Sequence, residues 1–387
     1  MNKKIKIAII NPHMKVGGIA SSLKNWSSFF NTREDLEIDY YIFEKEIDDK
    51  YLDFIKECNV IFPLNADKFQ LSKNSSKLKS LYVKILYKIG ILGHLKTKYT
   101  LNYKVSKKYD IAISYSNDIP RFNINLMSND FVINSIRADY KVAWVHNDID
   151  KLGFTREYIK KTYTNFDYIV NVSEACKKQF DLLVPEYINK SIVIGNPLDK
   201  EYLIKQSELI ADTHFRDGVL NFVTVARIHN EQKRIDRILD VVEKLKKDNL
   251  DFHWYIIGDG HDFDWLVRDS LKRKLDSHLT FLGFKTNPYP YMKNADYFVL
   301  TSDYEAQGMV LSEALMLRTP VISTNFEAAV EFIDEKKGYI TNKNAEDIYK
   351  LIKHLISNNI KLNFKEFVYN NYKNQFNDLL LLLEIDD

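Results

Sequence analysis

Short runs of β-branched and aromatic residues alternate with longer stretches of helical periodicity along the 387 residues of the chain. A first series of such runs predicts strands at residues 5–10, 39–43, 59–63, 110–114, 140–145, 168–172 and 191–195. A second series predicts strands at residues 220–226, 253–258, 279–283, 297–301 and 319–323. Strands separated by helix-length spacers are typical of parallel sheets with helices on both faces. The pattern therefore predicts an α/β protein with two doubly wound domains.

The two series are separated by residues 196–218, which lack a clear strand. We therefore expect an N-terminal domain over residues 1–200 and a C-terminal domain over residues 201–365. The tail at 366–387 has the pattern of a helix that ends in acidic residues, and we expect it to return to the N-terminal domain. A chain of this length exceeds one ordinary hydrophobic core, which agrees with two domains.

Composition excludes several classes of protein. The net charge is +2, so no global field favours nucleic acid as a partner. The two cysteines, Cys58 and Cys176, lie far apart and favour neither a disulfide framework nor a zinc site. No segment approaches the roughly 20 apolar residues of a membrane helix, and the apolar run near the N-terminus is too short for a signal peptide. We expect a cytoplasmic protein.

The segment from Ser72 to Tyr109 contains ten lysines and no carboxylate. Apolar residues recur in it near helical spacing, while Lys77, Lys84 and Lys88 fall elsewhere on the helical wheel. One interpretation is a surface helix with a solvated basic face. The other is contact of residues 73–108 with an anionic membrane surface, at about 1 kcal/mol per lysine.

Residues 302–314, SDYEAQGMVLSEA, place Glu305 and Glu313 around a predicted strand-to-helix turn. Carboxylates at such a turn make sense if they accept hydrogen bonds from sugar hydroxyls. The structural alternative is that Ser302 and Glu305 form a capping box and that Glu313 is a solvated helix residue.

The same turn contains Gly308, Met309 and Val310 near the start of the predicted helix. Ligands collect at the carboxyl edge of a parallel sheet. There, free helical N–H groups and the helix dipole favour an anion such as a phosphate. Glycine at position 308 lets a ligand approach the backbone closely.

Residues 225–239, VARIHNEQKRIDRIL, have the pattern of a strand, a polar loop and a helix. Arg227 ends the strand and Lys233 lies near the helix start. Two cations there can neutralise a diphosphate without a metal ion. The alternative is a pair of ordinary surface charges.

Glycines and a histidine follow strands of the first series. Gly17 and Gly18 lie at the start of a predicted helix. One interpretation is a loop that packs close to a phosphate or an acceptor, and the other is an ordinary turn. Neither this loop nor IIGDGH (256–261) is a GxGxxG fingerprint, which disfavours a dinucleotide oxidoreductase. His146 comes just past a strand end, where a structural role is the common one. The nearby Asp148-x-Asp150 is an alternative metal site, although DxD is frequent by chance.

Taken together, these residues resemble the family 4 glycosyltransferases of the GT-B type, in the bacterial surface-polysaccharide branch. The E-x7-E signature corresponds to Glu305 and Glu313, and the cation pair to Arg227 and Lys233. The resemblance is nearly continuous from 219 to 345, through IIGDG, FLGF, YMKNADYFVLTSDYE and EALMLRTPVIST. In the N-terminal half it is carried by the GG loop, WVHND, VSEACKKQF and IGNPLD.

The resemblance implies two Rossmann-like domains that face each other across a cleft, with acceptor bound by the first domain and nucleotide sugar by the second. It implies retaining, metal-independent transfer of a hexose or N-acetylhexosamine, with a UDP-linked donor as our choice on base rates. The acceptor would be a glycan or lipid-linked oligosaccharide of capsule or another cell-surface polysaccharide, at the inner face of the membrane. No cofactor is expected, since the nucleotide sugar is a substrate.

The resemblance also implies roles for individual residues. Glu305 would bind the donor sugar, Glu313 the ribose, and His146 would lie beside the sugar. Arg227 and Lys233 would stabilise the diphosphate leaving group. The remaining donor-binding residues would be Gly17, Gly18, Gly283, Phe284, Lys285, Gly308, Met309 and Val310, with the three around position 284 lining the base pocket.

Two departures from the family pattern affect these expectations. The family usually has Gly-Phe-Gly after the first glutamate, where this chain has Ala306, Gln307 and Gly308. The family often has glycine where this chain has Arg234. Two other functions remain open: a nucleotide-sugar epimerase of GT-B architecture, and a non-catalytic sugar-binding subunit of a glycosyltransferase complex.

Overall fold

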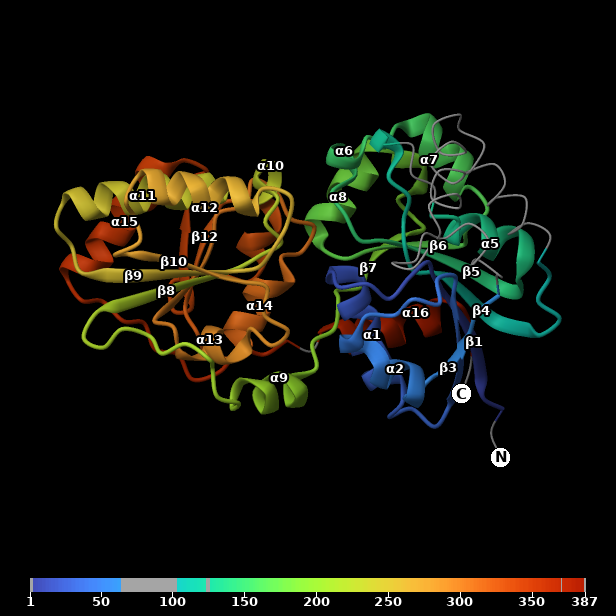
Figure 1. Ribbon diagram of the computed structural model, residues 1–387. Coiled ribbons are helices and arrows are strands. Elements are labelled where there is room, and N and C mark those ends of the chain that lie inside the picture. The colour runs from blue at the N-terminus through green and yellow to red at the C-terminus, as the bar shows by residue number, and fades with distance from the viewer. Residues whose placement is uncertain (1–2, 64–102, 123–125, 370, 386–387) are drawn as a thin grey trace, which may run out of the picture. The chain divides into compact units, whose positions relative to one another are not determined.

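The computed structural model describes residues 3–63, 103–122, 126–369 and 371–385 (Figure 1). The chain forms two compact units: unit 1 is Met1–Pro197 with Asn371–Asp387, and unit 2 is Leu198–Asn370. The first limit lies three residues before the expected 200, because helix α9 (Lys200–Ser207) packs against helices of unit 2. The second lies five residues beyond the expected 365.

The sheet of unit 1 contains seven parallel strands within the described residues, in the order β3-β2-β1-β4-β5-β6-β7. Each strand of the first predicted series is present. The strands are β1 (Ile5–Asn11), β2 (Leu36–Ile42), β3 (Asn59–Ile61), β4 (Lys108–Ser114), β5 (Arg137–Val145), β6 (Tyr168–Asn171) and β7 (Ser191–Val193).

The sheet of unit 2 contains six parallel strands within the described residues, in the order β10-β9-β8-β11-β12-β13. The strands are β8 (Leu220–Val225), β9 (Phe252–Ile257), β10 (Leu279–Gly283), β11 (Tyr297–Leu300), β12 (Val321–Thr324) and β13 (Gly338–Thr341). The sequence analysis missed β13, an edge strand of four residues that begins with a glycine and carries little apolar signal.

Both sheets have the doubly wound order, so the predicted pair of Rossmann-like domains is confirmed. The strand order reverses direction between β1 and β4 in unit 1, and between β8 and β11 in unit 2. In such sheets the loops at the carboxyl ends of these central strands diverge and form the ligand-binding edge. The predicted site residues should therefore be sought at these two edges.

Helices cover both faces of the unit 1 sheet (Figure 1). They are α1 (Gly18–Phe30), α2 (Leu52–Glu57), α5 (Ser128–Ser135), α6 (Ile149–Leu152), α7 (Arg156–Tyr163), α8 (Glu174–Leu183) and α16 (Asn371–Leu382). One core joins the sheet to α5, α7 and α8 through Phe131, Ile159 and Phe180. The terminal helix α16 packs against α1, where the rings of Trp26 and Phe376 lie 5.4 Å apart.

Helices also cover both faces of the unit 2 sheet, with α11 and α15 on one face and α13 and α14 on the other (Figure 1). Besides α9, they are α10 (Asn230–Lys233), α11 (Ile235–Lys247), α12 (Phe263–Lys272), α13 (Tyr289–Asn294), α14 (Met309–Met316) and α15 (Ala345–Ser357). In α11, apolar residues at helical spacing are fully buried against the sheet, including Ile238, Val242 and Leu245. This packing fixes the start of α11 beside the carboxyl edge. Short 3-10 helices lie at Asp49–Tyr51, Pro120–Phe122, Pro185–Tyr187 and Glu327–Glu331.

Candidate functional site

Two loops meet at the carboxyl edge of unit 2, after the neighbouring strands β8 and β11. The first contains α10 and ends at Lys233, and the second carries Glu305. Lys233 Nζ donates a hydrogen bond to Glu305 Oε1 and forms an ion pair with it. Only 13% and 11% of the two side chains are exposed, so the pair is largely shielded from water.

Glu305 is held by further hydrogen bonds. The hydroxyl of Ser302 donates to Glu305 Oε1 at 2.6 Å, and Gln232 Nε2 donates to Oε2 at 3.4 Å. The capping-box alternative is wrong, because α14 begins at Met309 with Gly308 as its N-cap. Ser302 therefore holds Glu305 within a loop and caps no helix.

The start of α14 faces the same edge of the sheet. Gly308 has φ +73°, and a Cβ atom there would lie 3.2 Å from the ring of Phe326. Glycine is therefore favoured both by the backbone conformation and by the limited space. The N–H groups of Met309 and Val310 belong to the first helical turn, where a helix has no internal acceptors for them. Glu313 is half-buried one turn further on.

Arg227 follows β8 and is exposed. Among the described residues, its guanidinium group forms no hydrogen bond and no ion pair. An exposed cation without a protein partner, on a loop at the ligand-binding edge, is available to an anion.

The loop that carries Arg227 is fixed by the GDG segment after β9. The N–H of Ile228 donates to the carbonyl of Asp259 at 2.9 Å. Cβ atoms at Gly258 and Gly260 would lie 1.8 Å from the carbonyl oxygen of Ala226 and 2.4 Å from that of Ile228, respectively. These glycines allow two loops to touch, which accounts for IIGDG without a bound phosphate.

A cluster of charges beside the pair was missed by the sequence analysis. Asp303 forms ion pairs with Arg237 at 2.6 Å and with Arg234 at 3.2 Å. Arg234 also pairs with Asp236 at 2.8 Å, and hydrogen bonds to that carboxylate raise the pKa of its guanidinium group. The departure from glycine at position 234 was the one signal in the sequence that pointed to this cluster.

The departures after Glu305 are accommodated by packing. Gln307 is buried, and its amide donates to the hydroxyl of Tyr369. The ring of Tyr369 in turn lies 5.9 Å from those of Phe332 and Phe367. Ala306 does not have a positive φ, so alanine brings no left-handed strain.

The three residues expected at the base pocket lie after β10. Gly283 has φ +68°, and the ring of Phe284 is 53% exposed. Lys285 donates to Asp212 at 2.6 Å, and hydrogen bonds from Lys285 and Tyr291 together lower the pKa of the Asp212 carboxyl to about 2. Lys285 therefore has an acidic partner within unit 2, and Phe284 offers an exposed ring for stacking.

In unit 1, Gly17 and Gly18 lie exposed after β1, at the start of α1. Neither has a left-handed φ, and a Cβ atom at Gly18 would have no neighbour within 4 Å. The protein itself therefore does not require glycine at position 18, which leaves room for a ligand to approach.

His146 follows β5 and is 7% exposed. Its backbone N–H donates to Asn117 Oδ1 at 2.9 Å, and the centroid of its ring lies 4.6 Å from that of Tyr115. Burial lowers the pKa of the imidazole to about 3, so the ring is neutral at neutral pH. Its Nε2 atom is buried and has no hydrogen-bond partner among the described residues.

The two aspartates of the DxD alternative lie at the start of α6. Asp148 is the N-cap of α6 and accepts a hydrogen bond from the N–H of Lys151 at 3.2 Å. In the described part of the chain, no group of three or more His, Cys, Asp or Glu side chains could hold a metal ion.

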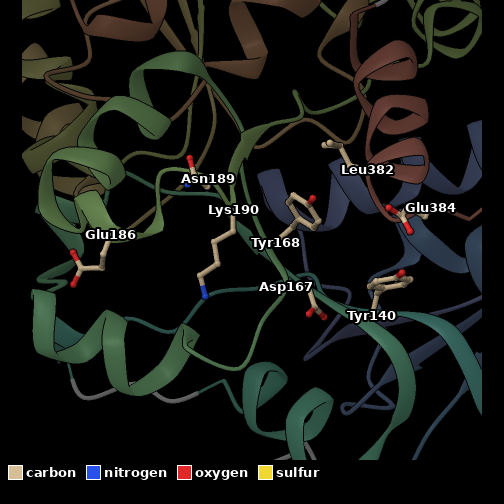
Figure 2. A pocket seen from close by; sticks show the side chains of 8 residues that line it. All are labelled: Tyr140, Asp167, Tyr168, Glu186, Asn189, Lys190, Leu382 and Glu384. Atoms are coloured by element: carbon tan, nitrogen blue, oxygen red, sulfur yellow. The ribbon is translucent and has the colours of Figure 1, made fainter.

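A depression of about 520 Å³ lies elsewhere, at the amino end of the unit 1 sheet (Figure 2). It is lined by Tyr140, Asp167, Tyr168, Glu186, Asn189, Lys190, Leu382 and Glu384. Lys190 Nζ donates to the carbonyls of Tyr163, Thr164 and Phe166 at 3.0, 3.2 and 3.1 Å. The ammonium group of Lys190 therefore binds carbonyl groups at and just after the end of α7. The depression contains none of the predicted site residues.

Most of the basic segment, including Lys77, Lys84 and Lys88, lies outside the described residues. At its described end, Lys107 pairs with Glu37 and Asp39, and Lys108 pairs with Asp139. Over the ranges that the structure covers, helices are too short or too polar to traverse a bilayer.

Residues 205–374 match the family model described as "Glycosyl transferases group 1". An uncharacterized glycosyltransferase of Methanocaldococcus jannaschii is 30% identical over 207 residues, which cover 52% of this chain and 53% of that protein. The poly(ribitol-phosphate) alpha-N-acetylglucosaminyltransferase of Staphylococcus aureus is 33% identical over 133 residues, 33% of this chain and 27% of that protein. The match thus spans about half of the first relative and less of the second.

Solved structures extend the likeness to the whole chain. The lipopolysaccharide outer core galactosyltransferase WaaB in its apo form superposes with a TM-score of 0.62 at 19% identity, over 98% of this chain and 99% of that one. Anabaena HepE in complex with UDP-glucose superposes with a TM-score of 0.63 at 16% identity, over 92% and 90%. These likenesses show the GT-B fold, with two Rossmann-like domains.

Proposed function

We propose that this chain, whose residues 205–374 form a glycosyl transferases group 1 domain, transfers a hexose or N-acetylhexosamine from a UDP-linked donor to a glycan acceptor. The observation that carries the proposal is the shielded ion pair of Lys233 and Glu305 at the carboxyl edge of β8 and β11. Exposed Arg227 and the first turn of α14 border the same edge.

The arrangement suits a departing nucleoside diphosphate. When the anomeric C–O bond breaks, its electron pair stays on the phosphate oxygen, and fixed cations and N–H groups stabilise that charge. An ammonium group has three N–H donors, so Lys233 can keep its bond to Glu305 and still donate to a phosphate. Glu305 has a second oxygen with acceptor capacity for a sugar hydroxyl.

We propose retention of anomeric configuration, as the resemblance implies. The acceptor oxygen attacks the anomeric carbon from the face that the diphosphate leaves, and the departing phosphate takes the acceptor's proton. His146 takes part as a neutral ring with a free nitrogen, because burial keeps its pKa near 3. Such a ring can accept one hydrogen bond or donate one, but it carries no charge.

We propose that no metal ion is needed, since Arg227 and Lys233 supply positive charge at the edge where the diphosphate would lie. We also propose an acceptor in cell-surface polysaccharide such as capsule. Relatives named for ribitol-phosphate polymer and O-antigen synthesis support this acceptor class. Unit 1 would bind the acceptor, at the inner face of the membrane.

The test is a donor screen. Purified protein is incubated with UDP-, GDP- and dTDP-sugars, with chelator present, and nucleotide release and products on lipid-linked acceptors are measured by mass spectrometry. We expect UDP release from a UDP-sugar, and we expect Lys233→Ala to slow this release by at least about tenfold. The proposal would be overturned if the protein neither binds nor cleaves a nucleotide sugar. Its metal-free form would be overturned if cleavage occurs only with added metal ions.

A further inference from the structure

Asp303 links the two loops of the candidate site through its side chain. Its carboxylate pairs with Arg237 Nη2 at 2.6 Å and with Arg234 Nη1 at 3.2 Å. Arg234 joins α10 to α11 and Arg237 lies in the first turn of α11, whereas Asp303 lies two residues before Glu305. One carboxylate thus connects the segment after Lys233 to the loop of Glu305.

Backbone hydrogen bonds extend this connection on both sides. The N–H of Asp303 donates to the carbonyl of Gln232 at 2.8 Å. The hydroxyl of Thr301 donates to the carbonyl of Lys233 at 2.9 Å, and Arg237 Nη1 donates to the carbonyl of Thr301 at 2.9 Å. The carbonyl of Lys233 is therefore tied to the loop that carries its ion-pair partner.

The conformation of Arg234 explains why the carboxylate is needed. Arg234 has φ +50° and ψ +48°, a left-handed conformation that a side chain disfavours. This residue ends α10 and starts α11, so it directs the chain that carries Lys233. The ion pairs to Asp303 and Asp236 hold the guanidinium group and oppose relaxation of this turn.

We propose that Asp303, which forms ion pairs with Arg234 and Arg237, is a positioning residue. It fixes the positions of Lys233 and Glu305 relative to each other for the reaction. It acts through these two side chains and does not touch the substrate. The inference rests on the proposed transferase function and adds a residue to it. Without the carboxylate, the hydrogen bonds to the carbonyls of Gln232 and Lys233 remain, but the ion pairs that hold Arg234 and Arg237 are lost. The ammonium group of Lys233 is then held less firmly relative to the departing phosphate.

The main test compares Asp303→Asn with Asp269→Asn. Asp269 on α12 pairs with Arg273, the C-cap of the same helix, at 2.8 Å, and the exposed fractions of Asp269 and Asp303 are 22% and 31%. It therefore controls for the loss of an ion pair in the same unit. We expect Asp303→Asn to lower kcat about ten- to a hundredfold with a small change in KM, since loss of preorganised geometry costs turnover. We expect Asp269→Asn to keep kcat, and Asp303→Glu to recover part of it.

A second measurement does not depend on activity. Hydrogen exchange followed by mass spectrometry should show faster exchange in residues 301–308 and 230–236 for Asp303→Asn, and in α12 for Asp269→Asn. Because Asp303→Asn leaves the buried Arg237 without its counter-charge, Arg234→Gly serves as a milder variant. Glycine adopts the left-handed turn without strain and removes only the ion pair with Arg234, while Asp303 keeps its pair with Arg237. The kcat should therefore fall by less than in Asp303→Asn, and the melting temperature should stay close to wild type.

The outcomes separate the two proposals. The proposed function is contradicted if the wild-type protein neither binds UDP nor turns over a nucleotide sugar. The positioning role alone is contradicted by a different result. In that case the wild type is active, Asp303→Asn and Arg234→Gly have the same kcat as Asp269→Asn, and hydrogen exchange in residues 301–308 is unchanged.

Discussion

The ammonium group of Lys233 and the carboxylate of Glu305 form a shielded ion pair although 72 residues separate them in the sequence. The pair exists because β8 and β11 are adjacent at the point where the strand order reverses. Each residue follows one of these strands. The topology of the sheet, rather than any local motif, therefore creates the charge arrangement on which the proposed chemistry depends.

The first prediction concerns this pair. Lys233→Ala should lower kcat by at least about tenfold, because a hydrogen bond to a charged group is worth roughly 1.5–3 kcal/mol and about 1.4 kcal/mol is tenfold. Lys244→Ala, which removes an exposed ion pair with Glu346 in the same unit, is the control. Steady-state kinetics with the donor found in the screen decide the matter, and equal kcat values for the two variants would contradict the role of Lys233.

The second prediction separates binding from stability at Arg227. Because its side chain is exposed and has no protein partner within the described residues, Arg227→Ala should change the free energy of unfolding by less than about 0.5 kcal/mol. The same variant should weaken UDP binding by about tenfold or more, since a charge-assisted bond is lost. Arg268→Ala, another exposed arginine of unit 2, should leave both quantities unchanged. Isothermal titration with UDP measures the affinity, and an unaltered Kd for Arg227→Ala would rule out the diphosphate contact.

The third prediction contrasts two glycines. Gly258→Ala places a Cβ atom 1.8 Å from the carbonyl oxygen of Ala226 and should destabilise unit 2 by about 1–3 kcal/mol or more. Gly18→Ala meets no atom within 4 Å and should keep the stability of the protein. If a ligand approaches Gly18, this variant should still lower kcat/KM. Chemical unfolding and kinetics test both statements, and a stable Gly258→Ala would show that the two loops can separate.

The fourth prediction is a pH dependence from His146. Its pKa is lowered to about 3 in the folded protein, below the ordinary value of 6.5, so the unfolded chain binds the extra proton first. Stability should therefore fall as the pH drops below about 6.5, by up to about 1.4 kcal/mol per pH unit until the folded pKa is reached. His146→Gln should flatten the dependence between pH 6.5 and 4.5 in urea unfolding. His253, whose pKa burial lowers to about 4, contributes in the same direction, so the difference between wild type and variant isolates His146. Identical slopes for both proteins would contradict the neutral, buried ring.

Much of the fold was predictable because buried parallel strands leave a strong local signal. The run FVTV within β8 consists of aromatic and β-branched residues, which are typical of a strand covered on both faces. The edge strand β13 lacks that signal, since GYIT is half-buried and short. The start of α14 was also predictable in outline, because Gly308 marks the turn into the helix.

The candidate site was predictable only where residues follow strand ends. Lys233 and Glu305 could be placed at one edge from the order of strands, but their direct contact depends on how two loops fold against each other. Asp303 carried no local signal, because its partners Arg234 and Arg237 lie more than 60 positions earlier in the chain. The spacing that suggested a capping box at Ser302 misled, since the helix begins later, at Met309.

The return of α16 to unit 1 has a consequence for synthesis of the chain. Unit 2 is one uninterrupted stretch, whereas unit 1 needs its last helix to cover the rings of Trp26 and Phe30 on α1. Domains generally fold in the order in which they leave the ribosome. In this chain α16 follows the whole of unit 2, so unit 1 can complete its packing around α1 only after unit 2 has been synthesised.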